Sequence, residues 1–113
     1  MANTTTYGMR RITCTVTSAG TRVPISPTSL FTTDFEVHVA AGNVGANMYI
    51  GNITVDNSWI PRAKGTTRNF TSGQAILIGM NQDVGFDLNK IYLDADANGD
   101  VAIIQYFAQD KPS

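Results

Sequence analysis

Apolar and polar residues alternate along two stretches of the chain, which is the pattern of a β-strand with one buried and one solvated face. In the first stretch, Met9 to Ser18, Ile12, Cys14 and Val16 fall on one face and mostly threonines on the other. In the second, residues 34–39, three apolar residues alternate with two acidic residues and a histidine. Both stretches predict half-buried antiparallel strands.

Shorter strands separated by turn residues account for most of the remaining chain. Pro24 and Pro27 confine one of them to a sheet edge or a sheet crossing, because proline cannot donate a ladder hydrogen bond. The segment Gln74–Met80 is apolar on both faces, which predicts either a central strand or a strand that a partner covers. The further predicted strands are Thr21–Ser26, Met48–Val55, Trp59–Ala63, Thr66–Thr71 and Gln74–Met80.

No segment sustains the three-to-four residue period of an amphipathic helix. Short strands at this spacing predict an all-β fold, a single antiparallel β-sandwich that is jelly-roll-like or has Greek-key connections. With 113 residues the chain has the length of one domain.

The segment from Asp94 to Asp100 supports two interpretations. Asp94, Asp96 and Asn98, followed by Gly99, match the first positions of a calcium-binding loop, where oxygen ligands precede an obligatory glycine. The position that should carry a bidentate glutamate holds Gln105, and the flanking residues are strand formers rather than helix formers. These departures make a calcium site the less favoured interpretation.

The favoured interpretation is a β-hairpin with a two-residue turn at Asn98-Gly99, a strong short-range hairpin signal. In that register Leu93 faces Ile104, and Asp100 lies on the opposite face from the other two aspartates. A three-residue loop would instead gather the three carboxylates, which is unfavourable without a cation. We therefore expect no metal and no cofactor, although the sequence alone leaves calcium open.

The strand after this turn, Val101 to Ala108, has no clearly polar face. In a small sandwich, a strand that is apolar on both faces requires a second covering layer. We expect a neighbouring subunit to supply that layer.

Composition narrows the classes of partner. Charged residues make up 15% of the chain, against about 25% in a typical soluble protein, and the net charge is −1. Dispersed basic residues argue against nucleic acid, and no apolar run is long enough to span a bilayer. The first residues lack the pattern of a secretory signal, so we expect synthesis in the cytoplasm without export by that route.

The search for catalytic residues finds little. Cys14 is the one cysteine and alternates with apolar residues, as a small core residue does. His38 is the one histidine and has Glu36 and Ala40 on its own face, which predicts a solvated position. The sequence contains no zinc-ligand spacing and no phosphate-binding loop. We therefore predict that the protein is not an enzyme.

The aromatic residues are the candidates for binding. Trp59 follows a turn and precedes Ile60-Pro61, and it is either packed within the domain or part of a partner interface. Tyr49, Tyr92 and Tyr106 fall in predicted strands, so a platform for stacking sugars is the alternative use of these rings.

Three motifs, in order along the chain, give a family resemblance: Thr17–Ile25, Asn43–Gly51 and Asp87–Ala95. With the final strand, they resemble the small head-decoration or cement proteins and related minor virion proteins of tailed bacteriophages. The chain departs from the family pattern in its longer stretch from Thr66 to Met80.

The resemblance implies a structural virion protein that binds the outer capsid surface and bridges neighbouring subunits of the major capsid protein, as a homotrimer. It implies no catalytic residues. The alternative is a phage tail or fibre module that binds host carbohydrate, and a more distant one is a calcium-stabilised β-domain outside any virus.

The first eight residues are polar and predict a flexible N-terminal arm, residues 1–8, ahead of a β-sandwich domain, residues 9–113. The predicted capsid contacts are Thr4, Arg10, Arg11 and Trp59, because the arm is basic at its end and leads directly into the first strand.

Overall fold

The computed structural model describes residues 6–71 and 86–110, and every regular element within these ranges is a β-strand. The strands are β1 Thr6–Val16, β2 Val23–Pro24, β3 Phe31–Thr32, β4 Phe35–Val39, β5 Asn47–Gly51, β6 Arg62–Ala63, β7 Thr67–Phe70, β8 Phe86–Asp87, β9 Tyr92–Ala95 and β10 Asp100–Asp110.

The strands pair in a nested order, like a long hairpin that has been rolled up. β1 pairs with β10, β2 with β9, β3 with β8, β4 with β7 and β5 with β6, all antiparallel. Rolling adds two pairings, β10 with β4 and β9 with β5. This nested arrangement is that of a jelly roll. The predicted all-β sandwich is therefore confirmed.

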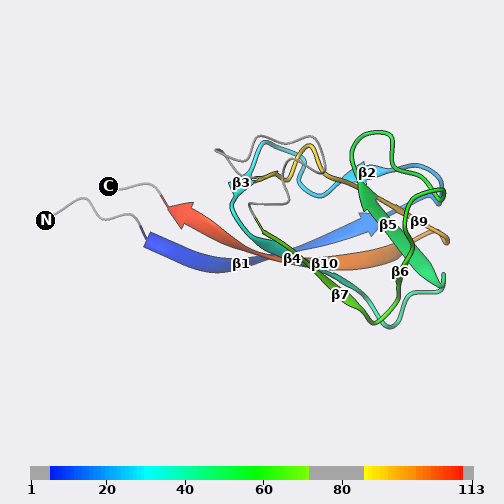
Figure 1. The fold of residues 1–113 in the computed structure, drawn as a ribbon. Helices are drawn as coiled ribbons and strands as arrows, with labels where there is room; N and C mark the ends of the chain where they lie inside the picture. The colour runs from blue at the N-terminus through cyan, green and yellow to red at the C-terminus, as the bar shows by residue number, and fades with distance from the viewer. Residues whose placement is uncertain (1–5, 72–85, 111–113) are drawn as a thin grey trace, which may run out of the picture.

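The rolled hairpin forms two four-stranded sheets, with orders β1-β10-β4-β7 and β2-β9-β5-β6, and the pair β3-β8 beside them. Figure 1 shows the two larger sheets facing each other, while β1 and β10 continue past the sandwich as a two-stranded ribbon toward the chain ends. We call the sheet that contains β1 the first sheet and the one that contains β2 the second sheet.

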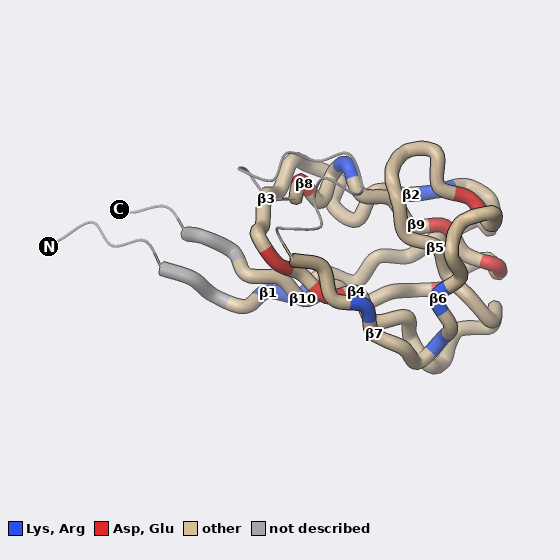
Figure 2. Tube along the Cα trace, in the orientation of Figure 1, with Lys and Arg blue, Asp and Glu red and all other residues tan. Residues whose placement is uncertain are grey.

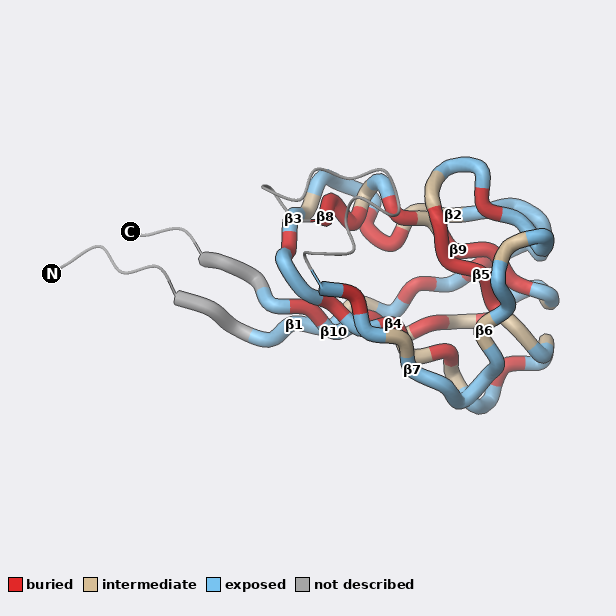
Figure 3. The backbone as a smooth tube through the Cα atoms, viewed as in Figure 1, coloured by how far each residue is buried: buried red, intermediate tan, exposed pale blue. Residues whose placement is uncertain are grey.

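The core lies between the two sheets, where Figure 3 shows the buried residues gathered. An aromatic cluster closes it at β4, β7 and β8. Phe35 stacks on Phe70 at 4.7 Å between ring centroids, and Phe86 meets Phe35 edge-on at 5.0 Å. The fully buried aliphatic and sulfur-containing side chains are Val16, Ile25, Val37, Val39, Met48, Val55, Leu88, Ile91, Leu93 and Ile104.

The alternating patterns predicted both half-buried strands correctly. In β1, Cys14 and Val16 are buried and alternate with the exposed Thr13 and Thr15. In β4, Phe35, Val37 and Val39 are buried. β2, which contains Pro24, is the outermost strand of its sheet, as the prolines of the predicted strand and its end indicated. The strand predicted over Met48–Val55 ends earlier, because the Asn52 carboxamide accepts a hydrogen bond from Thr54 N and turns the chain.

The hairpin predicted across Asn98-Gly99 is wrong. The chain does turn there, with Gly99 at φ 81°, but β9 and β10 belong to different sheets. Leu93 pairs with Val23 and Ile50 instead of Ile104. The turn carries the chain from the second sheet to the first, where Gly99 N donates to Val16 O at 2.8 Å. A turn signal predicts a reversal of direction, but not which strands then pair.

β1 begins at Thr6, so the arm predicted over residues 1–8 overlaps this strand at its last three residues. Residues 1–5 and the strand predicted over Gln74–Met80 lie outside the described residues.

Candidate partner-binding surfaces

The acidic corner, Asp94 to Asp100, is held by hydrogen bonds to neighbouring loops. The Asp94 carboxylate accepts from Gly20 N at 2.9 Å, and the Asn98 carboxamide accepts from Ala19 N at 2.8 Å. These two bonds attach the corner to the turn that follows β1. Both are made by oxygens that the calcium interpretation would assign to the ion.

Asp100 makes a bidentate contact with a second loop. Its Oδ1 accepts from Val44 N and its Oδ2 from Gly45 N, both at 2.9 Å, and the residue is 2% exposed. Asp96 Oδ1 accepts from the Tyr49 hydroxyl at 2.7 Å, and this hydrogen bond to a carboxylate raises the pKa of Tyr49 above its ordinary value. The carboxylates of the corner therefore act as acceptors that join three segments.

The acidic corner is neither the two-residue hairpin turn nor the three-residue hairpin loop that the sequence suggested, because β9 and β10 do not pair. Within residues 6–71 and 86–110, no three His, Cys, Asp or Glu side chains are grouped so as to hold a metal ion. A shallow cleft of about 310 Å³ beside the corner is lined by Ala19, Gly20, Asp56, Asn57, Asp94, Ala95 and Asp96.

Asp87 performs a similar role on β8, in the two-stranded pair β3-β8. Its carboxylate accepts from the Ser29 hydroxyl at 2.6 Å and from Leu30 N and Asn89 N, both at 3.0 Å. Burial alone would raise the pKa of Asp87, but these hydrogen bonds to the charged form outweigh it and hold the pKa below its ordinary value.

The outer face of the first sheet is the one on which the sequence predicted a covering partner. On β10, Ala102, Ile104 and Tyr106 point into the core. Among the outward residues, Ile103 is half-buried, whereas Phe107 is 46% exposed. The outward face is thus apolar at intervals, and the covering partner stays a prediction.

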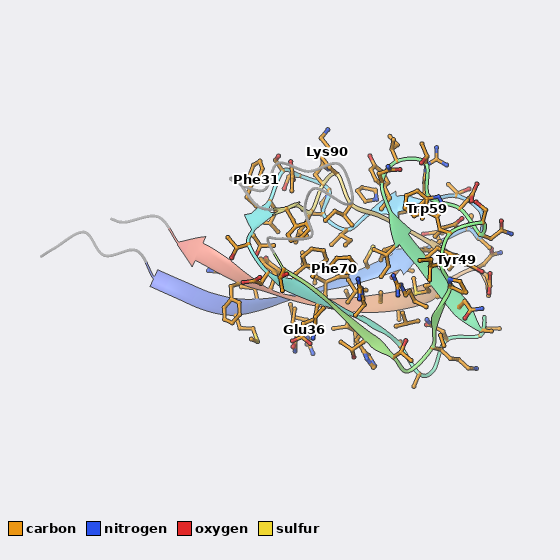
Figure 4. The ribbon with its side chains drawn as sticks, in the orientation of Figure 1. Phe31, Glu36, Tyr49, Trp59, Phe70 and Lys90 are labelled. Atoms are coloured by element: carbon orange, nitrogen blue, oxygen red, sulfur yellow. The ribbon has the colours of Figure 1, made fainter. Side chains whose placement is uncertain are left out.

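At the root of the ribbon this face becomes openly apolar. Met9 pairs with Phe107 across the two strands, and Met9 is 58% exposed. A cleft of about 380 Å³ opens beside this pair and reaches the aromatic cluster; it is lined by Met9, Asp34, Phe35, Glu36, Asn69, Phe70, Thr71, Gln105, Tyr106 and Phe107. Figure 4 labels two of the residues that line this cleft, Glu36 on β4 and the core residue Phe70 on β7.

The four predicted contact residues are not brought together. Arg10 and Arg11 are exposed on β1, where they lie on opposite faces of the first sheet, and Thr4 lies outside the described residues. Trp59 lies in the loop between β5 and β6, in the second sheet. The loop that contains Trp59 and the two arginines of β1 therefore belong to different sheets.

The ring of Trp59 is packed against the backbone of β5. A Cβ placed on Gly51 would overlap Cζ3 of the ring and lie 2.6 Å from Cε3. The side chain is half-buried, and its neighbours Ile53 and Ile60 are 58% and 69% exposed. Both uses of Trp59 that the sequence left open, packing within the domain and contact with a partner, are compatible with this position.

The two candidate nucleophile partners point to opposite sides of the first sheet. Cys14 is buried, where desolvation raises its pKa to about 11, and its thiol approaches Pro24 O at 3.6 Å. His38 lies on the outer face, with Nδ1 2.9 Å from the Thr67 hydroxyl. These positions do not form a Cys-His pair.

Two arginines that the sequence did not point to lie at the open side of the sandwich, which is the side between the outermost strands β6 and β7. Arg62 is on β6 and Arg68 is on β7, and the Nε atom of each is buried with no hydrogen-bond partner among residues 6–71 and 86–110. The signal was available for Arg68, because it is two residues from the buried Phe70 and so shares its inward face. The β6 strand is too short to show such a period.

Comparisons with known proteins give little. No protein-family model matches the chain, and no curated protein matches it. Within residues 6–71 and 86–110, no helix is long and apolar enough to cross a membrane. A solved chain from work described as "Bacillus endospore appendages form a novel family of disulfide-linked pili" is similar to this chain at 16% identity and a TM-score of 0.44, over 96% of this chain and 95% of the other. A similarity at this level carries no argument about what this chain does.

Proposed function

We propose that this protein is a non-catalytic structural protein that works within an assembly, and that it is a decoration or cement protein on the outer capsid surface of a tailed bacteriophage. In this proposal it bridges neighbouring subunits of the major capsid protein as a homotrimer, and it binds neither nucleic acid nor membrane. The observation that carries the proposal is the ribbon of β1 and β10.

The ribbon presents backbone groups suited to strand addition. β1 is the outermost strand of the first sheet and runs for 11 residues, and among the described strands it pairs with β10 alone. On the other side of β10, β4 pairs with Ala102 to Tyr106, and the Thr32 hydroxyl on β3 donates to Phe107 O at 2.9 Å. Residues Ala108 to Asp110 of β10 have no strand partner on that side among the described residues. An unpaired strand edge is a template for pairing with another chain.

A bridging protein needs two contact surfaces, and the ribbon has two edges. The exposed Met9-Phe107 pair adds an apolar face at its root, where burial against a partner is favourable. Figure 2 marks basic positions on the described part of β1, where Arg10 and Arg11 directly follow Met9, and the cleft beside the pair also contains Asp34 and Glu36. The apolar pair is therefore bordered by charged side chains of both signs. Several modest contacts made by linked copies hold a particle by avidity.

The test is binding to purified capsids, read by cosedimentation and by density in electron micrographs. Phe107→Asp places a charge in the apolar root of the ribbon and should reduce capsid binding at least tenfold. The matched control is Phe31→Asp, because Phe31 on β3 is 54% exposed and lies outside the first sheet. The control should bind as the unaltered protein does.

The localisation distinguishes this proposal from the alternative. Density distributed over the capsid shell, in threefold groups, supports a trimeric decoration protein. Density restricted to a tail or fibre tip refutes it and favours the carbohydrate-binding module. Light scattering of a monomer together with single copies on the shell would refute the trimer.

A further inference from the structure

The open side of the sandwich, between β6 and β7, concentrates positive charge. β6 and β7 are the outermost strands of the second and first sheets, and the loop of residues 64–66 joins them directly. Residues 57–71 contain three of the eight Lys and Arg residues of the chain and no Asp or Glu. In Figure 2, basic positions are marked on both strands.

Two of these residues, Arg62 and Arg68, face into the sandwich. Arg62 pairs with Met48 and Arg68 with Val37, and both partners are fully buried. Directly paired residues of antiparallel strands share a face of the sheet, so both arginines extend toward the gap between the two sheets. The Arg68 guanidinium lies 5.4 Å from the centre of the Phe70 ring, which supports one side of it.

Neither arginine has its Nε–H group satisfied within the part of the chain that the structure describes. The Nε atoms of both arginines are buried, and no hydrogen-bond acceptor among the described residues reaches either of them. Burial and the nearby charge of Arg68 lower the pKa of Arg62, which means that the two cations are close enough to repel each other. Buried polar groups of folded proteins almost always have a hydrogen-bond partner, so two buried Nε–H groups without one among the described residues are unusual.

We propose that Arg62 and Arg68 form a binding site for an oxyanion at the open side of the sandwich. A guanidinium presents Nε–H and Nη–H as a planar fork that matches the oxygen spacing of a carboxylate or phosphate group. Two forks on one anion satisfy both Nε groups and replace the repulsion by attraction. The anion is a free inorganic oxyanion or the carboxylate of an acidic side chain on a second protein chain. The site is independent of the proposed function.

The test measures the thermal stability of the purified protein in increasing sodium phosphate, with sodium chloride at equal ionic strength as the reference. Phosphate should raise the melting temperature saturably and beyond the effect of chloride. In Arg62→Gln and in Arg68→Gln this specific increase should be lost. Arg22→Gln is the matched control, because Arg22 is exposed in a separate loop, and it should keep the full response.

Lysine variants keep the test decisive if the glutamine variants do not fold. Arg62→Lys and Arg68→Lys retain the charge but lose the fork, and each should raise the phosphate concentration needed for half of the effect at least fivefold. Equal responses to phosphate and chloride, or lysine variants that respond as the unaltered protein does, would overturn the proposal.

Sedimentation separates the two sources of the anion. If the anion is a carboxylate on a second copy, the protein should self-associate with concentration, phosphate should dissociate the complex, and Arg68→Gln should abolish association. If the anion is free, phosphate should leave the state of association of the protein unchanged and should bind at one site per chain in calorimetry. The absence of both behaviours would contradict the site.

Discussion

The Asp100 contact should be the most costly side-chain interaction to remove from the acidic corner. Asp100→Ala leaves Val44 N and Gly45 N without their acceptor in a site where the carboxylate is 2% exposed. Hydrogen bonds to charged groups contribute about 1.5–3 kcal/mol each, and two that share one carboxylate are not additive, so we expect a loss of about 3 kcal/mol.

The measurement is urea unfolding followed by tryptophan fluorescence. With a denaturant slope of about 1.5 kcal/mol per M, a loss of about 3 kcal/mol lowers the midpoint by about 2 M. Asp96→Ala is the matched control, because Asp96 is exposed and accepts one bond, from Tyr49; its loss should be about 1 kcal/mol. If the two variants lose equal stability, the bidentate contact is not the source of the effect.

The same experiment tests the calcium interpretation. Chelation with EDTA should leave the midpoint of the unaltered protein unchanged, because the corner carboxylates accept hydrogen bonds from protein donors. A fall of many degrees in melting temperature on chelation, restored by calcium, would show that these carboxylates bind the ion instead.

The remaining predictions concern close contacts and one titration. Gly45→Ala should cost about 1–3 kcal/mol, because the new Cβ would lie 2.7 Å from a carboxylate oxygen and 3.0 Å from a backbone nitrogen, whereas Gly42→Ala, with open space around it, should be nearly neutral in the same urea assay. Gly51→Ala should displace the ring of Trp59 and shift its fluorescence maximum, and an unchanged spectrum would contradict the packing described. The pKa of Asp87 is lowered in the folded protein, so its carboxylate stabilises the fold above the ordinary Asp pKa of about 3.9. This stabilisation is lost as the pH falls below that value toward the folded pKa. The urea midpoint of Asp87→Asn should therefore fall less than that of the unaltered protein over this acid interval.

The local pattern of apolar and polar residues predicted the strands that have one buried and one exposed face. The alternation in β1 and β4 requires only that one face be apolar, and Pro24 in β2 excludes a central position whatever the strand pairs with. Such features depend on a few adjacent residues, which the sequence displays directly.

Pairing between distant segments could not be predicted in this way. The turn at Asn98-Gly99 is visible in the sequence, but whether β9 pairs with β10 depends on β1 and β5, which compete for them from far along the chain. The roles of Asp94 and Asp100 as acceptors for two other loops depend on that same arrangement. The sequence also does not show that β6 lies at a sheet edge, where the buried Nε of Arg62 has no hydrogen-bond partner among the described residues.

The nested order of the strands has a consequence for folding. Its innermost pair, β5 with β6, joins residues close in the chain, but the outermost pairing joins Thr6 to Asp110. Because the ribosome synthesises the chain from its N-terminus, β1 has no partner until residues 100–110 have been made. Proteins dominated by such distant contacts fold in about milliseconds to seconds, slower than those built from local ones. Until β10 arrives, β1 is an unpaired strand with an apolar face, so the interval between synthesis and closure is when this chain is most prone to aggregate.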